Sequence, residues 1–250
     1  MLPSSFTPVE RTWLWALLAV WALLLFGGFA FGRPDAPRIR RMPAWTRLVS
    51  SAILVLAAWS GYAFGRDSAG APFVLLIAAG MSLGFLGDLY MAQLLPAGQN
   101  HVLKGMSSFG LGHVAYSAGL LWFGSHNGLA APGPRWGAWL AWLLVGAAGW
   151  YLVIYRPVRR MLPLHWAALP YTLLLSSTAG CAFGLALQAP SLFPLAAGAI
   201  LFLLSDTVLA AHLFNNAHFF LVDDVIWLTY GLGQMLIVYA AGSALGLMGR

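Results

Sequence analysis

The sequence has very few charged residues and a single cysteine. Only 8% of its 250 residues are charged and 60% are hydrophobic, whereas an ordinary soluble domain has about 25% charged and 45–50% apolar residues. So few charged groups cannot cover a water-facing surface, which excludes a soluble globular enzyme and a disordered chain. Cys181 alone excludes an internal disulfide and a thiolate metal cluster. The composition, with a mean hydropathy of +0.79, predicts a protein of the lipid bilayer.

The hydrophobic residues are grouped in runs long enough to cross a membrane. A spanning helix needs about 20 mostly apolar residues, and these runs are continuous rather than alternating as in a β-barrel. The sequence predicts an all-α integral membrane protein, one transmembrane domain over residues 1–250 with eight helices. We expect them at about 12–32, 46–65, 71–92, 107–124, 136–154, 166–188, 193–214 and 224–247.

Basic residues between the runs predict the orientation. The loops that follow the first, third, fifth and seventh runs share one face of the membrane. Nine of the 13 Lys and Arg residues lie on that face, and four lie on the opposite face. By the positive-inside rule, these loops face the cytoplasm and both termini lie outside the cell (inner) membrane. The net charge of +6 thus reflects contact with anionic lipid headgroups, and we expect no nucleic-acid partner.

Two acidic residues lie inside apolar runs, where a carboxylate is energetically unfavourable. Asp88 is near the end of the third run and Asp206 is inside the seventh. An acid at helix centre costs about 2.5–3.5 kcal/mol on insertion scales. Each acid therefore has either a structural hydrogen-bond partner on another helix or a functional role, and we favour function more strongly for Asp206.

Other polar side chains occur at the same predicted depth. His113 and Tyr116 are three residues apart on one face of the fourth run, and Tyr230 and Gln234 are four apart on the eighth. Asp88, Asp206, His113, Tyr230 and Gln234 all lie near the cytoplasmic ends of their helices, in a slab about 6–15 Å below that surface. Polar groups from four helices at one level indicate a site.

An internal repeat supports this grouping. Residues 85–92 resemble residues 203–210, each with an Asp after a small residue, and residues 109–113 resemble residues 230–234. The third and fourth helices, and the seventh and eighth, therefore look like a parallel repeat. Such a repeat would bring Asp88 and Asp206 together. Glycines on the third and fourth runs, at 80, 84, 87, 105, 112 and 119, predict close helix packing.

These blocks carry a family resemblance. Gly87-Asp88, the segment from Gly105 through His113 to Tyr116, Ser205-Asp206, and Thr229-Tyr230 with Gln234 resemble the YhhN-like membrane proteins, the lysoplasmalogenase family. The resemblance spans about residues 45–245. It implies hydrolysis of the vinyl ether of lysoplasmalogens (1-alkenyl-glycerophosphoethanolamine or -choline) to a fatty aldehyde and the glycerophospho-base, with no cofactor. The polar segment 99–104 departs from the family pattern and bears on headgroup preference.

The chemistry agrees with two buried acids. Vinyl ether hydrolysis begins with protonation of the β-carbon and gives an oxocarbenium ion that water captures, so it needs a protonated acid and then an anion. Two carboxyl groups in a low-dielectric slab resist being ionised together. We expect Asp88 and Asp206 to share these roles, in either order. His113, Tyr116, Tyr230 and Gln234 would position substrate or water, and Lys104, Arg156 and Arg159 would bind the lipid phosphate.

Three other functions also fit parts of the pattern. A proton-coupled transporter of lipids or small molecules has repeated halves with acids at one depth, but it needs polar groups along the whole path. A metal-dependent membrane lipid hydrolase would take ligands from Asp88, His113 and Asp206. A scaffold would tolerate replacement of Asp206 by Asn. Motifs of zinc proteases and P-loop enzymes are absent from the sequence.

Overall fold

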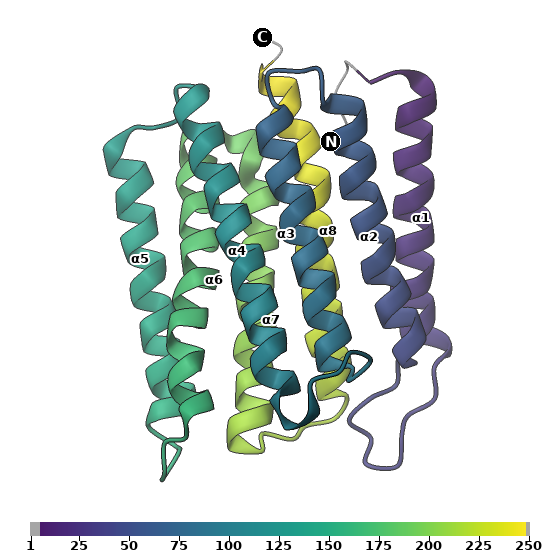
Figure 1. The fold of residues 1–250 in the computed structure, drawn as a ribbon, viewed down its shortest axis with the longest axis vertical. Coiled ribbons are helices and arrows are strands. Elements are labelled where there is room, and N and C mark those ends of the chain that lie inside the picture. Colours follow the sequence, from purple (N-terminus) through teal and green to yellow (C-terminus); the bar gives the residue numbers. More distant parts are fainter. Residues whose placement is uncertain (1–5, 249–250) are drawn as a thin grey trace.

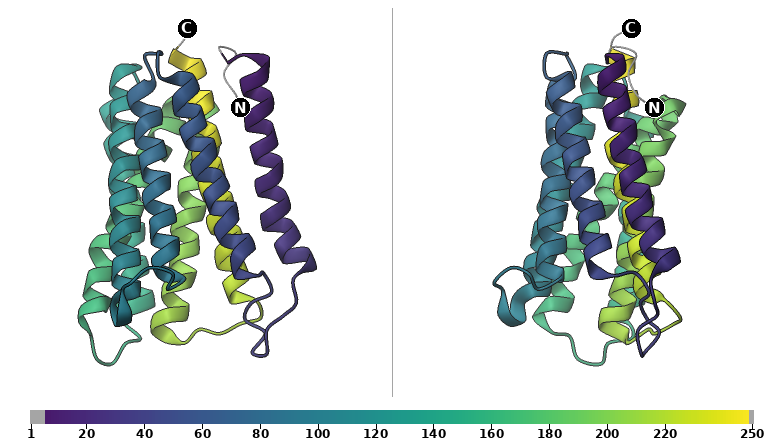
Figure 2. Two further views of the ribbon diagram at one scale, coloured as in Figure 1. Left: turned by 45° about the vertical axis from the view of Figure 1, so that its right-hand side comes forward. Right: turned by 90° about the vertical axis from the view of Figure 1, so that its right-hand side faces the viewer.

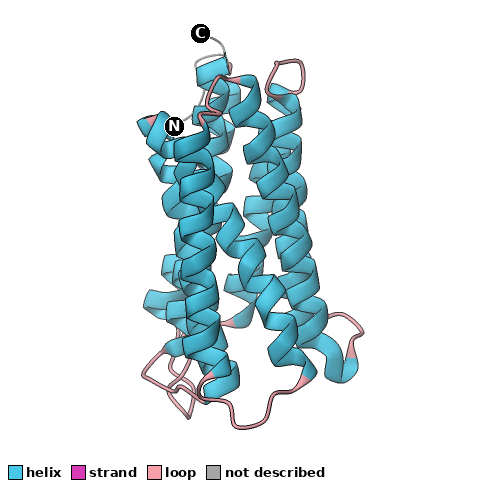
Figure 3. Ribbon diagram, turned by 90° about the vertical axis from the view of Figure 1, so that its left-hand side faces the viewer, coloured by secondary structure: helices cyan, strands magenta, loops and turns pink. Residues whose placement is uncertain are grey.

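The computed structural model describes residues 6–248 and folds them into eight α-helices (Figure 1). Their bounds are α1 Pro8–Phe31, α2 Ala44–Gly65, α3 Ala71–Met91, α4 His101–His126, α5 Pro132–Trp150, α6 Pro163–Gln188, α7 Phe193–Asn215 and α8 Val222–Met248. Two short 3-10 helices, η1 (Gly98–Asn100) and η3 (Pro190–Leu192), precede α4 and α7, and a π-helix, η2 (Tyr151–Tyr155), continues α5. Residues 6–248 contain helices and loops but no strand (Figure 3). The all-helical prediction is confirmed.

Seven of these helices are long and apolar enough to cross a membrane: α1, α2, α3, α5 with η2, α6, α7 with η3, and α8. The fourth helix is equally long, at 26 residues, but it is more polar because His101, Lys104 and His113 all belong to it. That α4 is an eighth span stays a prediction. Its position supports it, because α4 runs beside α3 and packs against both α3 and α6 (Figures 1 and 2).

The helices form an up-and-down bundle in which α1 begins and α8 ends at the same end of the molecule (Figure 1). α6 packs against α4, α5 and α7, and α8 packs against α2, α3 and α7. α1 and α5 lie at opposite flanks, on α2 and α6 respectively (Figure 1). The other six helices therefore surround a shared interior, into which the polar side chains described below project.

Glycines bring the backbones of neighbouring helices into direct contact. A Cβ atom on Gly112 would lie 3.0 Å from the carbonyl oxygen of Gly80, and one on Gly233 would lie 2.8 Å from the carbonyl oxygen of Gly198. Small residues, and glycine most of all, allow membrane helices to approach closely. The close packing of α3 with α4 that the glycine pattern predicts is thus present, and α7 packs with α8 in the same way.

Several helices begin earlier than the hydropathy pattern predicts. α1 begins at Pro8 rather than at residue 12, because the Thr7 hydroxyl accepts from the Glu10 amide and the Glu10 carboxylate accepts from the Thr7 amide. α4 begins at His101 rather than at 107, since the polar segment expected to be a loop forms η1 and two turns of helix. Polar residues extend these helices past their apolar parts, so hydropathy alone underestimates their length.

A buried acid attaches the loop between α1 and α2 to the start of α8. Asp224, which the sequence places at a helix end, is fully buried. One of its carboxylate oxygens accepts from the backbone N–H of Arg41 at 2.5 Å, and the other accepts from that of Met42 at 2.8 Å. The Leu221 amide also donates to the carbonyl of Arg38. Asp224 therefore has a structural role that is separate from the site.

Candidate active site

Asp88 lies in the last turn of α3 and is almost completely buried, with 3% of its surface exposed. The hydroxyl of Tyr230 on α8 donates to its Oδ2 at 3.0 Å. Ser51 of α2 lies beside the same carboxyl group. The acid that the sequence places in the bilayer thus has a hydrogen-bonding partner on α8, a helix distant in sequence.

The hydrogen bonds continue from Tyr230 across the bundle. The side-chain amide of Gln234 donates to the Tyr230 hydroxyl at 3.3 Å, and the Tyr116 hydroxyl on α4 donates to the Gln234 carbonyl oxygen at 2.8 Å. Tyr116 donates to Gln234, Gln234 to Tyr230, and Tyr230 to Asp88, and hydrogen bonds aligned in this way polarise one another. Tyr116, Gln234 and Tyr230 are all buried. The structure therefore joins four of the predicted site residues into one chain of hydrogen bonds.

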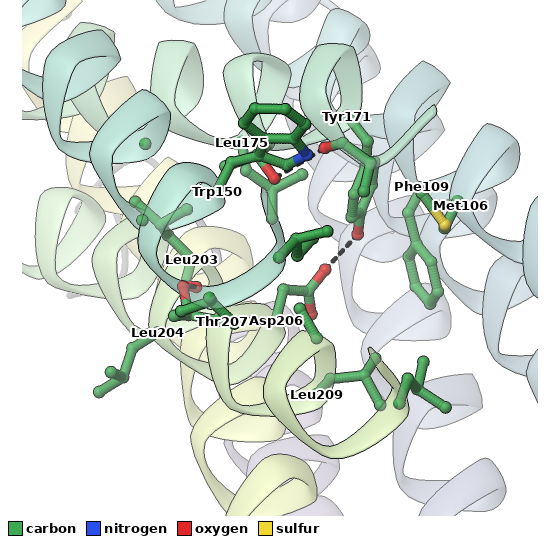
Figure 4. Close-up of a pocket in the computed structure, with 18 of the residues that line it drawn as sticks. Met106, Phe109, Trp150, Tyr171, Leu175, Leu203, Leu204, Asp206, Thr207 and Leu209 are labelled. Atoms are coloured by element: carbon green, nitrogen blue, oxygen red, sulfur yellow. Dashed lines mark hydrogen bonds between the residues drawn. The ribbon is translucent and has the colours of Figure 1, made fainter. Parts of the chain in front are cut away.

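Asp206 lies about 13 Å along α7 from Asn215, at 1.5 Å per residue, and its surroundings differ from those of Asp88. The side chain is half-buried, and its carboxyl group lines a cavity of about 340 Å³. The hydroxyl of Tyr171 on α6 donates to Asp206 Oδ2 inside this cavity (Figure 4). The cavity walls are otherwise almost entirely apolar, as with Phe109 and Leu203. Of the two acids, only Asp206 lines the cavity.

The cavity opens on the outer surface of the bundle. Val145 of α5 and Leu204 and Leu213 of α7 line it, and 54%, 50% and 41% of their surfaces are exposed. α5 and α7 both pack on α6, so the cavity lies along α6 between them. Near Val153, which also lines the cavity, η2 packs against α7. There the Asn215 side-chain amide donates to the Val153 carbonyl. An apolar mouth on the surface of a helical membrane bundle faces lipid chains.

His113 is in the interior but contacts neither acid by hydrogen bonding. Its Nδ1 lies 3.0 Å from the hydroxyl of Thr178 on α6, and its ring packs edge-on against Phe202, with 4.5 Å between ring centres. The ring centres of His113 and Tyr116 are 5.8 Å apart, in agreement with the predicted common face. Within the described residues, the buried Nε2 of His113 has no hydrogen-bond partner. His113 joins α4 to α6, and its role in positioning water stays a prediction.

The three candidate phosphate-binding residues lie outside the cavity wall. Lys104 is exposed, and its ammonium group donates to the Pro96 carbonyl at 3.1 Å and lies 5.7 Å from the centre of the Tyr90 ring. Arg156 and Arg159 are exposed between η2 and α6. Of the residues that line the cavity, Val153 on η2 and Met106 on α4 lie near them in sequence. These cations are therefore at the same end of the bundle as that part of the cavity.

No cluster of metal ligands occurs in the part of the chain that the structure describes. Residues 6–248 contain no group of three or more His, Cys, Asp or Glu side chains arranged to hold a metal ion. His113 faces Thr178, Asp88 faces Tyr230 and Asp206 faces Tyr171. The three residues considered as metal ligands thus have different partners.

Sequence reasoning missed two residues of the site region. Tyr171 follows Pro170 inside α6, which is not part of the predicted repeat, and a tyrosine in the middle of an apolar span is the signal that could have identified it. Arg47 was interpreted only as an orientation signal. Only 9% of its surface is exposed, and its guanidinium lies 5.1 Å from the centre of the Trp227 ring. Trp227 in turn packs edge-on against Tyr230, with 5.4 Å between the ring centres.

A comparison with known protein families identifies the family of this chain. The YhhN family model matches residues 42–241, a range that contains both acids, the hydrogen-bond chain and the cavity. No curated protein and no solved structure matches the chain. Because the match covers most of the 250 residues, the predicted family resemblance is confirmed, and the chain belongs to the YhhN family.

Proposed function

We propose that this protein is a membrane hydrolase that cleaves the vinyl ether bond of lysoplasmalogens. The products are a fatty aldehyde and glycerophosphoethanolamine or glycerophosphocholine. The observation that carries the proposal is the Asp206 carboxyl group in an apolar cavity whose mouth faces the membrane. Membership of the YhhN family, which includes lysoplasmalogenases, supports the same reaction.

The cavity fits a substrate with one hydrocarbon chain. Ligand pockets usually have volumes of about 300–1,000 Å³ and mostly apolar walls, and this cavity, at about 340 Å³, is in that range. The apolar mouth formed by Val145, Leu204 and Leu213 lets the alkenyl chain pass directly from the bilayer. The substrate phosphate then stays at the membrane surface, where Lys104, Arg156 and Arg159 are available to bind it.

The reaction needs an acid that can protonate carbon. A proton is added to the β-carbon of the vinyl ether, and the adjacent carbon becomes an oxocarbenium ion. Water adds to this carbon and gives a hemiacetal, which collapses to the aldehyde and the glycerol hydroxyl. One of Asp88 and Asp206 donates the proton and the other is the ionised partner, since two carboxyl groups close together in a dry interior resist being ionised at the same time.

The glycine contacts of the structure support the predicted repeat. Gly80 and Gly198 each precede an acid by eight residues, Gly112 and Gly233 directly precede His113 and Gln234, and both glycine pairs make the same backbone contact. This equivalence supports a parallel repeat of α3–α4 and α7–α8. We propose that the end carrying the loops after α1, α3, α5 and α7 faces the cytoplasm.

The test is a direct assay of aldehyde release. Purified protein in detergent is incubated with a lysoplasmalogen, and separately with the matching alkyl-ether and acyl lysophospholipids. We expect release of aldehyde from the alkenyl lipid alone, unchanged by a chelator. Asp206→Asn and Asp88→Asn should each abolish the release while the protein elutes as folded in size-exclusion chromatography. Absence of aldehyde from folded wild-type protein refutes the proposal, as does near wild-type turnover in both variants.

A further inference from the structure

The two acids differ in what they can reach. Asp206 lines the cavity, whereas Asp88 does not and is 3% exposed. A general acid must be within hydrogen-bonding reach of the atom that it protonates. A chain lying in the cavity therefore meets the Asp206 carboxyl group and not that of Asp88.

Tyr171 fixes the orientation of the Asp206 carboxyl group. Its hydroxyl donates to Oδ2, which leaves Oδ1 as the oxygen free to face a substrate in the cavity (Figure 4). Tyr171 itself lines the cavity from α6, the helix that packs against α7. A hydrogen bond to one carboxyl oxygen also stabilises the carboxylate that remains after proton transfer, because hydrogen bonds to charged groups are stronger than those to neutral groups.

The surroundings of Asp88 fit the ionised carboxylate of the reaction rather than the proton donor. Asp88 accepts the hydrogen bond from Tyr230 at the end of the chain that starts at Tyr116. These contacts occupy the Asp88 carboxyl group away from the cavity.

From these contacts we infer that Asp206 is the proton donor of the reaction and that Tyr171 is the positioning residue that presents it. Asp206 transfers its Oδ1 proton to the β-carbon as the π electrons of the double bond form the new C–H bond. Tyr171 keeps its own proton throughout. The attacking water then returns a proton to the Asp206 carboxylate, and collapse of the hemiacetal moves the hydroxyl proton to the glycerol oxygen. This assignment rests on the proposed function, and it adds a residue on α6 to the site.

The first test compares Tyr171→Phe with Tyr239→Phe. Tyr239 is a matched control because it is also a buried tyrosine that donates one hydrogen bond, here to the Leu14 carbonyl at 2.7 Å, and it does not line the cavity. We expect Tyr171→Phe to lower kcat by about 10- to 100-fold, the range for losing a hydrogen bond to a charged group. Its KM and the affinity for the uncleavable alkyl-ether lipid should stay within about twofold of wild type, because the apolar walls are intact. Tyr239→Phe should keep wild-type kcat.

The second test separates the two acids by chemical rescue. Asp206→Ala leaves a space on the cavity wall, so added formic acid should restore part of the turnover, whereas Asp88→Ala should not respond because its site is closed. Wild-type kcat in Tyr171→Phe, an equal loss in Tyr239→Phe, or rescue of Asp88→Ala alone overturns the assignment. Such results leave the proposed function intact as long as wild-type protein releases aldehyde. If Tyr171→Phe fails to fold, the rescue experiment alone still decides which acid is the donor.

Discussion

The contact between Gly233 and Gly198 predicts a sharp difference between two glycine-to-alanine substitutions. A Cβ atom on Gly233 would lie 2.8 Å from the Gly198 carbonyl oxygen and 3.0 Å from the Phe202 amide nitrogen. Ordinary contacts of this kind begin at 3.4 Å, so α7 and α8 would have to separate by about 0.6 Å. A Cβ atom on Gly61 of α2, by contrast, meets nothing within 4 Å.

The matched pair isolates the steric contribution. Both substitutions gain the same preference of Ala over Gly in a helix, about 0.5–1 kcal/mol, so this gain cancels in the comparison. What remains is the cost of overpacking, about 1–3 kcal/mol. We therefore expect Gly233→Ala to be less stable than Gly61→Ala by about that amount. Gly112→Ala should behave like Gly233→Ala, because its Cβ would lie 3.0 Å from the Gly80 carbonyl oxygen.

Equilibrium unfolding in mixed micelles of a mild detergent and sodium dodecyl sulfate measures these free energies. Aldehyde release, measured in parallel, should fall in Gly233→Ala, because Gln234 is the next residue and its hydrogen bonds to Tyr116 and Tyr230 depend on the position of α8. Equal stability of Gly233→Ala and Gly61→Ala would refute the claim that α7 and α8 meet backbone to backbone.

Three further predictions follow from other contacts. Gln234→Leu leaves two buried tyrosine hydroxyls short of a partner and should lower the free energy of unfolding by about 1–3 kcal/mol, measured as above, with wild-type stability as the contrary result. Asp224→Asn should expose the loop between α1 and α2 to faster proteolysis, since one backbone N–H would lose its acceptor, whereas the exposed Asp67→Asn should not. Gly149→Phe should extend into the cavity, because Gly149 lines it and a Cβ there is unobstructed; turnover of long alkenyl chains should fall more than that of short ones, and an equal effect on both would contradict the proposed chain site.

The sequence predicts the helical architecture well because its signal is strong and local. Continuous apolar runs mark the helices, and the two acids are conspicuous in them. The same hydropathy signal misjudges helix ends: α4 begins at His101, six residues before its apolar run, because polar residues also form helix.

The site is predicted only in part, since its geometry depends on which helices become neighbours. The spacing of Tyr230 and Gln234 places them on one face, and the structure joins them by a hydrogen bond. Nothing in the local sequence shows that Tyr171 on α6 meets Asp206, or that Thr178 on the same helix meets His113. These pairs come from the packing of α6 against α4 and α7, which hydropathy does not specify.

Because α5 lies at the edge of the bundle, the shape of the cavity can change independently of the two acids. α5 supplies one wall of the cavity but rests on the bundle mainly through α6, while both acids belong to helices of the interior. Substitutions on the inner face of α5 can therefore reshape the space offered to a hydrocarbon chain without disturbing the groups that would react with it. Related chains could diverge in the lipids they accept by changing this one helix, while the reaction itself stays the same.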